Sequence, residues 1–401
     1  MGLHDGLELA EIIVAILVGF GAVATPSFKI GEWFGKRSAA SESASKIGVL
    51  EERNNKLQGQ AAALEGQVRD GEVECQRLRA DLESALQELL VQEKQLVDAF
   101  SSSEKIWRRF PAIKPPNFDA ANAHSKTKIL TIGNLKGGVG KTTLAVNLAA
   151  YFARKLEKRV LVIDVDYQGS ASNMLRRFVQ QEDTRSKIDA LFTRDDRPEI
   201  FGNAVESLES KLPRAFLLPS SHGFDDVESR AMIEWFAARG EFDVRYHLAR
   251  FLANLDIRDR YQVIIIDTPP RLTTGMISAL CASTHLLVPT KLDGLSAEAV
   301  APFLKSVETL IGDLNPTLKL AGVVGTMTRD YRIDGPAEDA ISTLRDTLNW
   351  FGNPAPLFDN ILPTRTSIAD AAARSVAYVA DPTVRPLFDK IGEQLASRIE
   401  L

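Results

Sequence analysis

The stretch GNLKGGVGKTT, Gly133–Thr143, separates two segments of different character. The apolar run KILTI at 128–132 precedes it, which predicts a buried strand, and a helical pattern follows it. Three glycines would let backbone N–H groups close around an anion at the N-terminus of that helix: Gly137, Gly138 and Gly140. The stretch therefore predicts a phosphate-binding loop.

The side chains of this loop suit a nucleotide with a metal ion. Lys141 would contact the β- and γ-phosphates, and the Thr142 hydroxyl would ligate Mg²⁺. The usual G-x-x-x-x-G-K-[ST] pattern fails because Leu135 stands where its first glycine should be, and K-G-G-x-G-K-T fits instead. A single lysine can serve the phosphates, so the second, Lys136, needs another explanation. The other loop residues expected to bind ATP are Gly137, Gly138, Val139, Gly140, Lys141, Thr142 and Thr143.

Short β-rich runs alternate with helical patterns beyond the loop. The runs are RVLVIDV, QVIIIDT, THLLVPT and LAGVVGTM. Continuous apolar strands between helices are typical of a mostly parallel sheet covered by helices on both faces. We therefore expect residues 128–401 to form an α/β domain of the P-loop NTPase class.

Three carboxylates follow or end these predicted strands. Asp267 ends an apolar run and is placed to hold Mg²⁺ through water. Asp164 and Asp166 lie two residues apart on a strand, so both point to one side of the sheet edge. A helix cap or a loop-fixing hydrogen bond is the alternative for Asp164.

Several motifs together resemble the ParA/MinD family of ATPases. The loop resembles the family's deviant Walker A motif, VLVIDVDYQGSAS (160–172) its second motif, and VIIIDTPP (263–270) its Walker B motif. The segment ILPTRTSIADAAARSVAYVADP (361–382) is similar to the one that borders the adenine. The resemblance covers about residues 128–395 and is nearer to ParA than to MinD through Gln168 and Gly169. It does not cover the first 125 residues.

The resemblance implies roles for individual residues. Lys136 would reach across a two-fold interface to the phosphates of a partner subunit, so that Lys136, Lys141 and Asp166 form the catalytic set. Asp166 would orient the attacking water, although Tyr167 follows it where the family usually has proline. Within one subunit, Lys136 could instead be a solvated surface charge. The metal set that the resemblance implies is Thr142, Asp164 and Asp267.

The adenine and DNA contacts of the family carry over less directly. For adenine we expect the pairs Thr326–Met327 and Leu362–Pro363, with core packing as an equal alternative. The family often uses C-terminal arginines for non-specific DNA, but Thr364 and Ser367 stand at two such positions. The sequence therefore allows DNA binding without demanding it.

An apolar stretch lies near the start of the chain. Ile12–Phe28 holds 17 consecutive uncharged residues, or about 26 Å of helix, at the lower end of what spans a bilayer. Acidic residues precede it and Lys29, Lys36 and Arg37 follow it, which places its C-terminal side in the cytoplasm. We expect residues 1–40 to be a single-pass anchor in the cell membrane, with a partner-buried helix or an interfacial anchor as alternatives.

Residues 41–100 contain no proline and hold 12 acidic and 7 basic residues. Their heptads predict a coiled coil and hence a parallel homodimer, because a buried polar residue such as Asn54 favours two strands. A helical hairpin broken at Gly71 is the alternative. The a positions are Ile47, Asn54, Ala61, Val68, Cys75, Leu82, Leu89 and Leu96, and the d positions are Leu50, Leu57, Leu64, Gly71, Leu78, Ala85, Gln92 and Ala99.

Residues 101–127 have prolines at 111, 115 and 116 and little periodicity, which predicts a linker. Trp107, Arg108, Arg109 and Phe110 could contact a membrane or a nucleic acid, or dock onto the following domain. The two cysteines of the 401-residue chain lie far apart, which argues against a disulfide framework or a cysteine-based metal site. A net charge of −5 gives no sign of a strongly basic nucleic-acid binder.

These features favour a membrane-anchored ATPase that acts as a switch. ATP with Mg²⁺ would close two subunits into a sandwich dimer, hydrolysis would open it, and an unidentified protein would stimulate the cycle. The cargo could be a chromosome, a plasmid or a protein complex. One alternative is a bacterial tyrosine-kinase-like protein, but the last tyrosine is Tyr378 and the tail has no tyrosine cluster. Another is the ATPase component of a signalling or defence complex.

Overall fold

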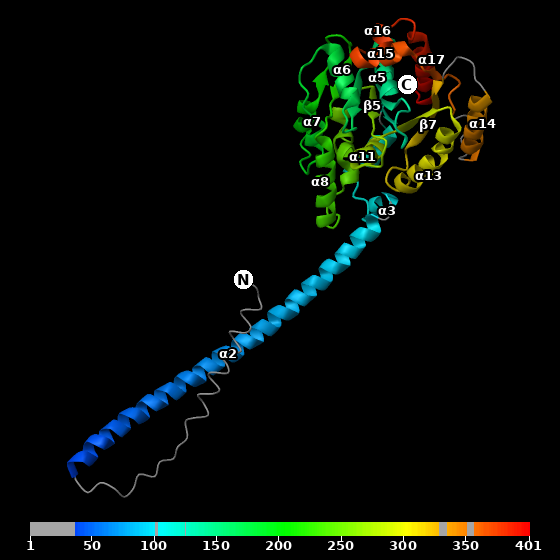
Figure 1. Ribbon diagram of the computed structural model, residues 1–401. Helices are drawn as coiled ribbons and strands as arrows, with labels where there is room; N and C mark the ends of the chain where they lie inside the picture. Colours follow the sequence, from blue (N-terminus) through cyan, green and yellow to red (C-terminus); the bar gives the residue numbers. More distant parts are fainter. Residues whose placement is uncertain (1–36, 101–102, 125, 329–334, 351–356) are drawn as a thin grey trace. The chain divides into compact units, whose positions relative to one another are not determined.

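The computed structural model describes residues 37–100, 103–124, 126–328, 335–350 and 357–401 (Figure 1). The chain divides into two compact units, Met1–Lys94 and Gln95–Leu401. The predicted membrane segment, Ile12–Phe28, lies outside the described residues. Within these five ranges, no helix has both the length and the apolar character needed to cross a membrane.

The first unit contains a single long helix over its described residues. Helix α2 (Arg37–Phe100) has 64 residues and passes through Gly71 without a break, unlike the hairpin alternative. All side chains from 46 to 87 are exposed in the single chain. These include apolar heptad positions such as Leu50 and Leu57, which are 65% and 56% exposed. One long helix is therefore observed, and its pairing as a coiled coil stays a prediction.

The second unit is built on an eight-stranded sheet, in the order β3-β4-β2-β5-β1-β6-β7-β8. Strand β3 pairs antiparallel to β4, and the other pairs are parallel, as the apolar runs predict. The strands are β1 (Lys128–Ile132), β2 (Val160–Asp164), β3 (Glu206–Ser207), β4 (Ala215–Leu218), β5 (Val263–Asp267), β6 (His285–Lys291), β7 (Lys319–Thr328) and β8 (Leu362–Pro363).

Helices cover both faces of this sheet (Figure 1). Ile264 and Ile266 of β5 face one hydrophobic core, whereas Val263 and Ile265 face the other, as the period of two in a strand requires. The first core is covered by α7 (Pro198–Ala204), α8 (Phe224–Ala237), α9 (His247–Leu252), α10 (Leu255–Arg258), α11 (Thr274–Ala282), α12 (Gly294–Glu298), α13 (Val300–Ile311), α14 (Gly335–Trp350) and the short turns η1 (Ile188–Leu191) and η2 (Val244–Tyr246). The second is covered by α5 (Lys141–Arg154), α6 (Ser170–Val179), α15 (Thr366–Arg374), α16 (Ala377–Ala380) and α17 (Arg385–Arg398). This architecture confirms the expected α/β class.

The structure corrects the prediction of a linker. Residues 103–124, which we call the docked segment, belong to the second unit and include α3 (Ser103–Trp107) and α4 (Phe118–His124). Trp107 is 2% exposed and stacks on Trp235 of α8 at 6.3 Å between ring centres. The docking alternative is therefore the one observed.

A buried arginine holds the irregular backbone of the docked segment. Arg245 donates hydrogen bonds to the carbonyl oxygens of Trp107 (2.7 Å), Pro111 (2.9 Å) and Phe110 (3.2 Å). It also pairs with Asp243, which accepts a hydrogen bond from Ile113 N (3.0 Å). Four backbone polar groups of the segment therefore find partners on Arg245 and Asp243, although Pro111 and Ile113 themselves are exposed.

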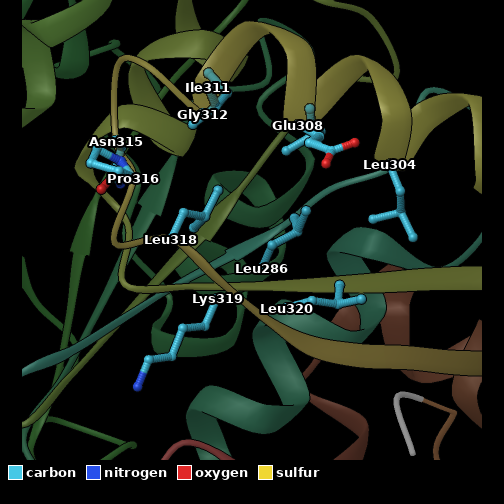
Figure 2. Close-up of a pocket in the computed structure, with 11 residues that line it drawn as sticks. Leu286, Leu304, Glu308, Ile311, Gly312, Asn315, Pro316, Leu318, Lys319 and Leu320 are labelled. Carbon is cyan, nitrogen blue, oxygen red and sulfur yellow. The ribbon is translucent and has the colours of Figure 1, made fainter. Parts of the chain in front are cut away.

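Figure 2 shows a cavity of about 440 Å³ beside the amino ends of two strands, β6 and β7. Leu286 and Leu320, near the amino ends of β6 and β7, line it with Leu304 and Ile311 of α13. The loops that carry the sequence motifs follow the carboxyl ends of the strands. This cavity is therefore separate from the predicted nucleotide site.

Candidate nucleotide site

The pairing of three central strands brings the predicted site residues to one edge. Ile132, the last residue of β1, pairs with Asp267, the last residue of β5. Asp267 also pairs with Asp164, the last residue of β2. In an open parallel sheet, ligands bind beyond the carboxyl ends of the strands, where the connections diverge. The phosphate loop and the carboxylates therefore meet where such a ligand belongs.

The phosphate loop is fixed by hydrogen bonds to neighbouring strands. Gly138 and Gly140 have φ angles of 67° and 84°, a left-handed conformation that glycine adopts without strain. Asn134 donates to Pro289 O (2.8 Å) and accepts from Lys136 N (2.9 Å). The carbonyl of buried Val139 accepts a hydrogen bond from Thr326 Oγ1 (2.9 Å). The loop is therefore tied to the ends of β6 and β7 as well as to β1.

Lys141 begins α5 and bends back over the loop. Its side chain is largely buried, and Nζ donates to Lys136 O at 3.1 Å. Burial lowers the pKa of Lys141, while the charges of Asp267 and Asp166 raise it. A phosphate group would add negative charge beside this amine and favour its protonated form. The position suits the predicted role.

Thr142 and Asp267 form a pair that suits Mg²⁺. Thr142 Oγ1 donates to Asp267 Oδ2 at 2.7 Å, and Asp267 is fully buried. Asp267 Oδ1 has no hydrogen-bond partner among the residues that the structure describes. Burial raises the pKa of Asp267 well above its usual value, and the charge of Asp164 raises it further. A divalent cation would favour the ionised carboxylate, and hydroxyl, carboxylate and water oxygens are the ligands Mg²⁺ takes. These two residues fit the ion.

The Asp164 carboxylate accepts hydrogen bonds from the residues that follow it in the chain. Its Oδ2 accepts from Ser172 N (2.9 Å) and Ser172 Oγ (2.7 Å), and its Oδ1 accepts from Asp166 N (3.0 Å). Burial raises its pKa to about 6, against these hydrogen bonds. The geometry is that of the loop-fixing alternative, and a role in the metal's water shell stays a prediction.

Asp166 lies in a tight turn after β2, so the prediction that it shares a strand with Asp164 is wrong, because β2 ends at Asp164. Its carbonyl accepts from Gly169 N (2.8 Å), and its Oδ1 accepts from Gln168 N (3.0 Å). Gly169 has a φ of 62°, and a Cβ there would lie 2.8 Å from Ser220 O. The turn therefore depends on this glycine, and it forms although Tyr167 replaces the family's proline.

Lys136 does not share the position of Lys141. Its Nζ donates to Ser296 Oγ of α12 at 2.6 Å and lies 3.7 Å from Asp293 Oδ1. The Lys136 side chain is 36% exposed. Asp293 also accepts from Ser296 N (2.8 Å), so the start of α12 presents a fixed acceptor pair. In the single chain, Lys136 therefore rests on α12.

The remaining loop and adenine candidates lie on the same edge. Gly137 is exposed and Thr143 is half-buried in the first turn of α5. Met327 is 41% exposed with a φ of 58°. Pro363 of β8 pairs with Thr328, next to Met327, so the expected adenine residues are neighbours. Thr326, in contrast, is buried and hydrogen-bonded to the phosphate loop.

Sequence reasoning missed several residues around the site. Asn134 fixes the loop, and Asp293 with Ser296 holds Lys136. Asn134 could have been found as a polar residue directly after a predicted strand. Asp293 and Ser296 could have been found as an Asp-x-x-Ser pattern, which is typical of a helix N-cap. Glu228 of α8 accepts from Gly275 N at the start of α11, and burial raises its pKa to about 7. An acidic residue within a helix gives no such signal.

The loop, the Thr142–Asp267 pair and the parallel sheet together define a P-loop nucleoside triphosphatase. A family model described as "AAA domain" matches residues 127–320. The chain is 28% identical over 280 residues to "Chromosome-partitioning ATPase Soj" of Thermus thermophilus, which covers 69% of this chain and 98% of that protein. It is 31% identical over 254 residues to an uncharacterized protein of Pseudomonas putida, covering 63% and 87% respectively.

Solved structures give the same fold. Apo McdA of Cyanothece superposes with a TM-score of 0.55 at 23% identity, covering 67% of this chain and 99% of that one. The chain belongs to the ParA/MinD family of P-loop ATPases. It is an ATPase, and its phosphate loop and the Thr142–Asp267 pair fit ATP with Mg²⁺.

Proposed function

We propose that this ATPase is a nucleotide-driven switch that positions or partitions a cargo. Two copies would close face to face around two ATP molecules, and hydrolysis would separate them. Relatives named as chromosome-partitioning proteins, from Thermus thermophilus and Caulobacter vibrioides, support a task of this kind. An unidentified protein would stimulate the cycle, and the cargo is left open between nucleic acid and protein assemblies.

The position of Lys136 carries the proposal. Lys141 serves the loop of its own chain, and Lys136 points to α12, where Ser296 and Asp293 receive it. The contact with Asp293 is long and partly exposed, and such ion pairs contribute only about 0–1 kcal/mol. The triphosphate of a second copy would therefore compete well for this cation. A lysine with a weak contact in its own chain can leave that contact and bind the phosphates of a partner subunit.

The exposed heptad positions of α2 support pairing with a second copy. Leu57, Leu64 and Leu78 are 56%, 50% and 57% exposed in the single chain. Burying such side chains would stabilise a dimer by about 25 cal/mol per Å² of apolar surface. A parallel coiled coil would also raise the effective concentration of the two ATPase units for each other.

Co-expression of Lys136→Ala and Lys141→Ala chains tests the shared site. Each variant alone is expected to be inactive, because the first lacks the donated lysine and the second does not bind ATP. In a mixed dimer, the Lys136→Ala subunit binds ATP and receives Lys136 from its partner. Steady-state phosphate release should return to roughly a quarter of the wild-type rate, since half of randomly paired dimers are mixed and each holds one intact site.

The matched control is Lys155→Ala, which removes an exposed lysine paired with Asp389 and Glu393. Lys155→Ala keeps both loop lysines and should be active by itself. When it is co-expressed with Lys141→Ala, the activity should come from the Lys155→Ala homodimers and from the Lys155→Ala subunits of mixed dimers, so no inactive variant is rescued. A Lys136→Ala chain that is as active alone as the wild type, or mixed dimers as inactive as both parents, would contradict the shared site.

We further propose that residues 1–40 anchor the protein to the cytoplasmic side of the cell membrane. The support is the apolar stretch Ile12–Phe28 with cationic residues after it. Deletion of residues 1–40 should move the protein from the membrane to the soluble fraction, measured by cell fractionation, with phosphate release retained. Deletion of residues 41–47, which leaves Ile12–Phe28 in place, is the control. Persistent membrane association after the first deletion would rule out this anchor.

A further inference from the structure

Two loops at the carboxyl edge are fixed beside each other. The loop after β2 is closed by Gly169 N donating to Asp166 O, with Tyr167 between them. The loop after β5 is closed by Thr273 N donating to Arg271 O at 3.0 Å. Because both loops are hydrogen-bonded turns, side chains that leave them start from defined positions.

Arg271 and Tyr167 meet between these loops. Arg271 Cζ lies 5.2 Å from the centre of the Tyr167 ring, a cation–π distance. The Tyr167 ring packs against the hydrophobic core, which fixes its orientation, whereas Arg271 is exposed. Over the described ranges, no carboxylate forms an ion pair with the Arg271 guanidinium. The cation is held by a ring face, and its hydrogen-bond donors stay available.

Both loops start at the edge that carries the site carboxylates. Tyr167 directly follows Asp166, and Arg271 comes four residues after Asp267, the last residue of β5. Asp164 and Asp267, which end the strands before the two loops, pair with each other in the sheet. Arg271 and Tyr167 therefore lie in the loops that carry the residues expected to bind Mg²⁺ and to orient the attacking water.

We propose that Arg271 contacts the γ-phosphate of ATP bound to its own chain, and that Tyr167 positions it. A guanidinium presents a planar fork of N–H donors that matches phosphate oxygens. Such a group stabilises the negative charge of the phosphoryl group during transfer. Arg271 would thus add a cation from the same chain to the one that Lys136 supplies from the partner.

This role explains why tyrosine stands at position 167. Proline at that position would offer no aromatic face, so the guanidinium would lose its support. An arginine stacked on a ring has less conformational freedom to lose when it binds phosphate. Under this proposal, Tyr167 and Arg271 therefore act together: the ring positions the guanidinium, and the guanidinium contacts the phosphate.

The test compares Arg271→Ala with wild type in the full chain, in two measurements. In steady-state hydrolysis, kcat should fall about 100-fold, the usual cost of losing one donor to a transition state. In binding, affinity for ADP with aluminium fluoride, an analogue of the transferring phosphoryl group, should fall similarly, while affinity for ADP alone changes less than about 2-fold. Arg271→Lys should recover part of both losses.

Tyr167 variants separate positioning from contact. Tyr167→Pro should lower kcat about 10-fold, because the guanidinium is retained but no longer held. Tyr167→Phe keeps the ring and should restore kcat relative to Tyr167→Pro. If the two variants have equal kcat values, the ring does not position Arg271, and that part of the proposal is overturned.

Arg194→Ala is the matched control, because Arg194 is also exposed and stacks on a ring, that of Phe242, at 4.2 Å. It should change neither kcat nor analogue binding. A purely structural role for Arg271 would instead lower the melting temperature of Arg271→Ala and leave kcat and analogue affinity at wild-type values. That result would overturn the proposal, and so would an equal loss of affinity for ADP alone.

Discussion

Replacement of Lys141 with alanine is expected to remove measurable ATP binding. The amine is largely buried at the start of α5 and lies against the loop carbonyl of Lys136. Lys141 is the cation expected to contact the phosphates bound to its own chain, and Asp267 and Asp166 beside it would repel a triphosphate once it is gone. Loss of a buried charge partner costs about 2–5 kcal/mol, or at least about 30-fold in affinity. Titration calorimetry with ATP and Mg²⁺ gives the measurement.

Lys155→Ala is the control for that experiment. Lys155 lies at the other end of the same helix and pairs with Asp389 at 3.0 Å and Glu393 at 3.1 Å. Because Lys155 lies at the surface, its removal should leave ATP affinity unchanged and have little effect on stability. A folded Lys141→Ala protein with wild-type ATP affinity would remove the assignment of the phosphate loop.

Replacement of Asp166 with alanine should separate binding from hydrolysis. Asp166 accepts from Gln168 N in the turn after β2, and no described phosphate-loop atom depends on it. ATP binding should therefore persist, whereas loss of the group that orients water should lower kcat by about 10²–10⁴-fold. Under the proposed dimer cycle, ATP would then trap the closed form. Phosphate release and ATP-dependent cross-linking between subunits measure the two effects.

Asp195→Ala provides the matched control, since Asp195 carries a surface ion pair with Arg197 at 2.7 Å. It should behave as wild type in both assays. Wild-type hydrolysis by Asp166→Ala would remove the catalytic role of Asp166. Loss of ATP binding would instead indicate that the turn after β2 shapes the phosphate site.

The position of the site followed from the sequence for a simple reason. Asp164 and Asp267 end continuous apolar runs, and the glycine-rich loop follows a third. Since parallel strands present their carboxyl ends at one edge, the three were expected to meet there, and the strand pairing places them in register. Local pattern was sufficient because each residue sits at the end of its own strand.

Roles that depend on distant partners could not be predicted in the same way. The Asp164 carboxylate accepts a hydrogen bond from Ser172, which lies on the next helix. The Lys136 amine donates a hydrogen bond to Ser296, which is 160 residues away. The docked segment was expected to be a linker because its prolines interrupt any periodicity. What holds it is Arg245, more than a hundred residues later, and no feature of residues 101–127 indicates that partner.

The docked segment determines where an autonomous ATPase fragment has to begin. A fragment starting at Lys128 would uncover Trp235 and leave Arg245 without the three carbonyls that it now serves. Arg245 would keep its ion pair with Asp243. Hydrogen bonds to a charged group contribute about 1.5–3 kcal/mol each, so the loss of three of them is a large part of what keeps most domains folded. Expression work should therefore retain the chain from before Ser103, because a cut at the apparent start of the sheet would yield a protein prone to aggregate.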